Sequence, residues 1–127
     1  MTRMNALHNS KNPFQGDFKK ILTVCSAGLL RSPTLAYMLC FPTYSYNPRS
    51  CGIHDYALIQ IDSVLVNWAD IIIFLHKDVY EACPLPYKEC KNKQIIIFNI
   101  PDEFEFRDPK LIDLLKKECI KHKLIES

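Results

Sequence analysis

A nine-residue segment contains the side chains with the clearest capacity for chemistry: Cys25-Ser26-Ala27-Gly28-Leu29-Leu30-Arg31-Ser32-Pro33. A cysteine thiolate is a strong nucleophile, and an arginine guanidinium can bind two oxygens of a tetrahedral oxyanion at once. The residues between Cys25 and Arg31 are enough for the backbone to curl and point successive N–H groups at an anion. This spacing therefore predicts a nucleophilic cysteine at the base of a loop that binds a tetrahedral anion.

The segments on either side would position this loop. Residues 21–25 form a short apolar run, typical of a central parallel strand, and residues 32–39 show a helical spacing of apolar side chains. The loop would thus join the carboxyl end of a strand to the amino end of a helix, where ligands of open α/β sheets bind. The amides and the dipole of such a helix end favour a bound anion and the thiolate form of a cysteine.

Alternation of strand and helix patterns continues along the chain. Runs typical of strands occur at 21–25, 44–51, 71–75 and 94–99. Helical patterns follow at 32–39, 62–68 and 77–82, and a long one begins at Asp108-Pro109. We expect an α/β three-layer sandwich with a four-stranded parallel sheet, helices on both faces and a phosphate-binding loop after the first strand. Pro48 favours an edge position for the second strand.

Composition fits one soluble globular domain. The chain has 127 residues, of which 48% are hydrophobic and 24% are charged, and its net charge of +2 argues against a general nucleic-acid or membrane-surface binder. We expect a polar amino-terminal arm at 1–18, followed by one domain at 19–127. The first twenty residues contain no apolar run long enough for a signal or a span, so we expect a cytoplasmic chain, a monomer or weak dimer.

Six cysteines are unusual for this length, and in the cytosol they are expected to be thiols. Their spacing includes no Cys-x-x-Cys pair, so we expect neither a bound metal nor another cofactor.

The loop resembles the signature of the low-molecular-weight protein tyrosine phosphatases, Cys-x5-Arg-Ser/Thr-Pro directly after the first strand. Residues 49–52, Arg-Ser-Cys-Gly, are similar to the Ser-Ala-Gly end of that family's second strand, and residues 67–72 resemble its next helix-to-strand passage. The resemblance covers roughly residues 20–124. It implies a cysteine-dependent phosphatase that hydrolyses phosphomonoesters, above all phosphotyrosine in proteins, whose partner is a phosphorylated protein or a small phosphomonoester.

The resemblance also implies roles for individual residues. Cys25 would attack phosphorus and form a phosphocysteine intermediate, and Arg31 would stabilise the transition state. Ser32 would hydrogen-bond the thiolate and make it a better leaving group. The whole phosphate-binding set would be Ser26, Ala27, Gly28, Leu29, Leu30, Arg31 and Ser32.

A general acid must protonate the departing oxygen, and in this family it is an aspartate after the last strand. Two aspartates compete here. Asp108 is followed by proline, as in the family, but the same pair is standard helix-start chemistry. Asp102 comes directly after the strand, and we choose it because ligands meet the strand ends. The side chains that would line the substrate-binding site are Phe104, Phe106 and Tyr56.

Two positions depart from the family's pattern. Gly28 replaces an asparagine that supports the loop; glycine can adopt the same backbone conformation but lacks the side-chain hydrogen bonds. Leu30 replaces a second cysteine that in many members protects the oxidised nucleophile.

Three alternatives remain. Arsenate reductases share this scaffold and need two further cysteines, for which Cys83 and Cys90 are candidates, although His76 occupies the place of the first. A phosphate-recognition module would bind phosphoprotein without turnover. A phosphatase specific for phosphoserine is compatible with the same loop.

Overall fold

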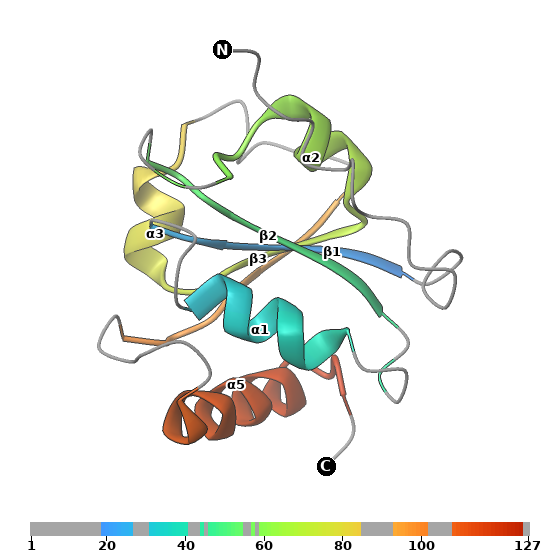
Figure 1. The fold of residues 1–127 in the computed structure, drawn as a ribbon, viewed down its shortest axis with the longest axis vertical. Helices are drawn as coiled ribbons and strands as arrows, with labels where there is room; N and C mark the ends of the chain where they lie inside the picture. Colours follow the sequence, from blue (N-terminus) through green and yellow to red (C-terminus); the bar gives the residue numbers. More distant parts are fainter. Residues whose placement is uncertain are drawn as a thin grey trace.

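The computed structural model describes residues 19–26, 31–40, 44, 46–54, 57, 59–84, 93–101 and 108–125. Strands and helices alternate along this part of the chain (Figure 1). In order, they are β1 (Lys19–Cys25), α1 (Arg31–Leu39), β2 (Tyr46–Gly52), α2 (Ser63–Trp68), β3 (Ile71–Phe74), α3 (Lys77–Ala82), β4 (Gln94–Ile97) and α5 (Pro109–Lys121).

The four described strands form one parallel sheet in the order β2-β1-β3-β4. Central strand β1 pairs with β2 and β3, and its register places Cys25 beside Gly52. The predicted four-stranded parallel sheet is confirmed, and so is the edge position of the strand that contains Pro48. An edge strand tolerates proline because the backbone on its outer side has no neighbouring strand to which an N–H would donate.

Helices cover both faces of the sheet, as expected for a three-layer sandwich. Helices α1 and α5 pack on one face and contribute Leu35 and Leu115 to its core. Helices α2 and α3 pack on the other face, with Leu65 and Val79. Figure 1 shows α2 on one side of the strands, with α1 and α5 on the opposite side.

The apolar strand runs follow from this double cover. Successive strand residues point to opposite faces, so Ile73 joins the core under α1 and α5, whereas Ile72 and Phe74 join the core under α2 and α3. Residues 71–75 are all buried. A parallel strand in the middle layer therefore needs apolar side chains at every position, which is the pattern that predicted it.

Boundaries differ from the predictions by one or two residues. β1 begins at Lys19 rather than at 21 because Lys19 and Lys20 pair with the start of β2. The last strand ends at Ile97 rather than at 99. Asp62 is the N-cap of α2, where its side chain accepts a hydrogen bond from Leu65 N (2.9 Å).

No helix in the described part of the chain is both long enough and apolar enough to cross a membrane.

Candidate active site

The carboxyl end of β1 and the amino end of α1 meet at one edge of the sheet. Cys25 is the last residue of β1 and is 3% exposed, and α1 begins at Arg31. The structure thus places the two ends of the predicted loop where the sequence placed them. Residues 27–30 of the phosphate-binding set lie outside the described residues, and Arg31 is described only as the first residue of the helix.

Ser32 contacts the candidate nucleophile directly. Its Oγ lies 3.0 Å from Cys25 Sγ, and it also donates to the backbone carbonyl of Cys51 at 3.2 Å. Ser32 is fully buried, so water does not compete for this hydroxyl. The hydroxyl has a single hydrogen and can give it to a thiolate, which stabilises negative charge on the sulfur.

Backbone hydrogen bonds from the segment after β2 hold the start of the loop in place. Ile53 N donates to the carbonyls of Cys25 (3.1 Å) and Ser26 (3.0 Å), and His54 N also donates to Ser26 O (3.1 Å). Gly52, at the end of β2, bonds in turn to the backbone of Ile59. The sequence indicated this segment only through its likeness to a strand end, because backbone hydrogen bonds leave no mark on residue type.

Sequence reasoning also missed Thr23, the only hydroxyl-bearing residue in the apolar run 21–25. Thr23 is fully buried, and its Oγ1 donates its single hydrogen to Ser32 O (2.9 Å), with Arg49 O as a second, longer acceptor (3.2 Å). The available signal was a hydroxyl within a strand where the pattern otherwise demands apolar side chains.

Of the two candidate acids, only Asp108 is described. It is the N-cap of α5, and its Oδ1 accepts a hydrogen bond from Lys110 N at 2.9 Å. Its carboxylate therefore has the structural role that the Asp-Pro pair also predicts. Asp102, Phe104, Phe106 and Tyr56 lie outside the described residues, so their roles remain predictions.

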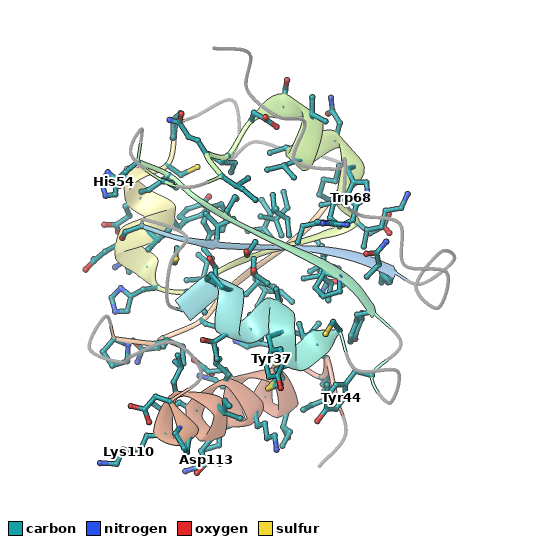
Figure 2. The ribbon with its side chains drawn as sticks, in the orientation of Figure 1. Tyr37, Tyr44, His54, Trp68, Lys110 and Asp113 are labelled. Carbon is teal, nitrogen blue, oxygen red and sulfur yellow. The ribbon has the colours of Figure 1, made fainter. Side chains whose placement is uncertain are left out.

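The described residues after β4 are bound to the backbone at the carboxyl end of β3. After β4, Phe98 N donates to Phe74 O (2.7 Å), and Ile100 N donates to Leu75 O (3.0 Å). Ile100 is thus bound beside the carboxyl end of β3, two positions before Asp102. In Figure 2, His54 and Lys110 both lie on the left of the view, and Trp68 lies on the right.

The cysteines differ in their surroundings. Those at positions 25, 40, 51, 83 and 119 are thiols, while Cys90 lies outside the described residues. Cys25 belongs to the core under α1 and α5, whereas Cys83 belongs to the core under α2 and α3, on the opposite face of the sheet. A Cys25–Cys83 disulfide would therefore require the chain around α3 to move.

Metal-ligating side chains do not gather within the described ranges: no three His, Cys, Asp or Glu residues there are arranged to hold an ion.

Known proteins resemble the chain in structure. No protein-family model matches it, and no curated protein does. The tyrosine phosphatase Wzb from Escherichia coli K30 is 15% identical with a TM-score of 0.60, over 84% of this chain and 96% of Wzb. The YwlE arginine phosphatase from Geobacillus stearothermophilus is 18% identical with a TM-score of 0.53, over 86% of this chain and 97% of YwlE.

A thioredoxin-dependent arsenate reductase from Corynebacterium glutamicum is 14% identical with a TM-score of 0.55, over 86% of this chain but 59% of the reductase chain. At these identities the likeness shows the fold. The chain has the fold of the low-molecular-weight tyrosine phosphatases, as its loop predicts.

Proposed function

We propose that the chain is a cysteine-dependent phosphatase that hydrolyses phosphomonoesters, most of all phosphotyrosine in proteins. The observation that supports this most strongly is the 3.0 Å contact between Cys25 Sγ and Ser32 Oγ at the carboxyl edge of a parallel sheet. The buried Ser32 hydroxyl beside this sulfur can donate a hydrogen bond to it when the sulfur leaves phosphorus with a negative charge. The Cys-x5-Arg sequence around this contact supplies the anion-binding groups.

In the first chemical step, Cys25 attacks phosphorus and the bond to the leaving oxygen breaks. Arg31 and the loop amides would stabilise charge on the equatorial oxygens, and Asp102 would protonate the leaving group. In the second step, water attacks the phosphocysteine and gives its proton to Asp102. The sulfur then leaves as a thiolate that accepts a hydrogen bond from Ser32.

Substrate choice within this fold is wide, because the three neighbours act on phosphotyrosine, phosphoarginine or arsenate according to their names. We infer an aromatic phosphoester here because Phe104, Phe106 and Tyr56 lie in sequence next to the strand ends that hold the site. Aromatic side chains would pack against the ring of phosphotyrosine.

Hydrolysis of p-nitrophenyl phosphate by the wild type tests the proposal. We expect vanadate to inhibit turnover and Cys25→Ser to abolish it. A phosphotyrosine peptide should be hydrolysed faster than phosphoserine and phosphoarginine peptides of the same sequence. Binding of phosphate without any turnover would instead support a phosphate-recognition module.

Arsenate reduction is the second candidate, favoured by the reductase with the same fold. The position of Cys83 under the opposite face of the sheet weighs against it. Thioredoxin-coupled reduction of arsenate that is lost in Cys83→Ser would establish this activity.

A further inference from the structure

The hydroxyl of Thr23 joins three elements beneath the candidate active site. Its Oγ1 donates to the carbonyl of Ser32 in α1 at 2.9 Å, and the carbonyl of Arg49 in β2 lies 3.2 Å away. Thr23 itself belongs to β1 and is fully buried. Burying a hydroxyl without a hydrogen-bond partner lowers the stability of the fold. These two carbonyls supply partners and so allow a hydroxyl at a position where the strand pattern calls for an apolar side chain.

Ser32 is consequently held at two points. Its carbonyl accepts from Thr23, and its own hydroxyl lies between Cys25 Sγ (3.0 Å) and Cys51 O (3.2 Å). Thr23 and Cys25 are two residues apart on β1 and point to the same face. The strand that ends in the nucleophile thus also anchors the residue that contacts the nucleophile.

We propose that Thr23 is a positioning residue of the active site: its hydroxyl fixes the backbone of Ser32 so that the Ser32 hydroxyl stays within reach of Cys25 Sγ. The inference rests on the proposed function in one respect, since it takes Cys25 as the nucleophile. It adds a residue that neither the loop motif nor the resemblance indicates.

Because the Ser32 backbone is held in place, its hydroxyl hydrogen can rotate from Cys51 O to Cys25 Sγ without any other movement of the residue. When Cys25 is a thiol, its S–H can donate to Ser32 Oγ while Ser32 donates to Cys51 O. When the P–S bond of the phosphocysteine breaks, the sulfur keeps the electron pair and the Ser32 hydrogen turns toward it. The new bond forms between water oxygen and phosphorus, and the water proton goes to Asp102.

Removing the Thr23 hydroxyl should therefore weaken the second step more than substrate binding. For Thr23→Val we expect kcat to fall by about 10- to 100-fold, the range of the hydrogen bond from Ser32 to the leaving thiolate, and KM to fall with kcat because the phosphocysteine accumulates. Thr23→Ser keeps the hydroxyl and should retain most of the rate. A pre-steady-state burst of p-nitrophenol should grow in Thr23→Val because the phosphocysteine breaks down more slowly.

A second readout does not require phosphatase activity. Alkylation of Cys25 by iodoacetamide at mildly acidic pH follows the fraction of thiolate, and peptide mapping assigns it to Cys25. We would measure it in wild type, Thr23→Val, Thr23→Ser, Ser32→Ala and the double variant. Ile21→Val is the matched control, since Ile21 is buried on the same face of β1 and its side chain offers no hydrogen bond.

The double variant decides the proposal. If Thr23 acts through Ser32, Thr23→Val slows alkylation and turnover in the wild type but adds nothing in the Ser32→Ala background. Equal factors in both backgrounds, wild-type rates in Thr23→Val, or the same loss in Ile21→Val would overturn it. Thr23→Ala replaces Thr23→Val if the latter does not fold.

The two proposals can fail separately. Absence of phosphatase activity in the wild type would count against the proposed function, while the alkylation series would still decide the role of Thr23.

Discussion

The two candidate acids, Asp102 and Asp108, can be separated by experiment, because each should affect a different property. Asp108 caps α5 by accepting one hydrogen bond, 2.9 Å long, from Lys110 N on its Oδ1. Loss of an N-cap side chain costs about 1 kcal/mol. Helix α5 is also held by buried Leu111, Leu115 and Cys119, so the helix should survive the loss of its cap.

Three variants test this difference. Asp108→Ala removes the cap, so we expect the free energy of unfolding to fall by about 1 kcal/mol and the melting temperature by roughly 3–5 °C, with kcat near wild type. Asp108→Asn removes the charge but keeps a good cap, so both stability and kcat should stay near wild type. Asp102→Asn should leave stability unchanged and lower kcat by about 10²- to 10⁴-fold, the usual contribution of a general acid.

The assay is p-nitrophenyl phosphate hydrolysis together with thermal unfolding of the same samples. Substantial loss of kcat in Asp108→Asn, with little loss in Asp102→Asn, would refute the assignment and make Asp108 the acid.

Two further predictions concern the core of the domain. Burial, with a smaller effect from Glu118, raises the pKa of Cys119 from 9.0 to about 12. The folded state therefore binds the Cys119 proton more tightly than the unfolded state does. The protonated thiol contributes its full share of folding stability below pH 9, and this contribution is lost as the pH rises toward 12. Urea unfolding from about pH 8 to about pH 10 should show a loss of about 1 kcal/mol that shrinks in Cys119→Ala; an equal loss in that variant would contradict the assignment. Leu115→Ala, at a fully buried position of α5, should cost about 2–5 kcal/mol, whereas Ile120→Ala, 39% exposed on the same helix, should cost far less; similar costs would contradict the packing described here.

The sequence predicted the fold well because the fold depends on patterns that a single sequence shows. The middle strand at 71–75 is apolar at every position since helices cover both of its sides. Asp108 marked the start of a helix because an N-cap needs a side-chain acceptor. Strand ends were less accurate because β1 begins at Lys19 through pairing with β2, and pairing partners are distant in sequence.

The candidate site was predictable only in part. Cys25 and Ser32 were indicated by the loop motif, and their 3.0 Å contact agrees with the role that the resemblance implies. Thr23 was not indicated, because a threonine within a strand is common and only the packing of α1 and β2 gives its hydroxyl two acceptors. The hydrogen bonds from Ile53 N and His54 N were equally hidden, since every residue except proline has a backbone donor.

The central claim is that Cys25 becomes covalently phosphorylated during turnover. Rapid acid quench of the enzyme with p-nitrophenyl phosphate, followed by peptide mass spectrometry, tests it most directly, and Ser32→Ala should increase the signal by slowing breakdown of the intermediate. We predict a phosphoryl group on the peptide that contains Cys25 and none in Cys25→Ser. Turnover that persists in Cys25→Ser, or a phosphoryl group on another residue, would contradict it.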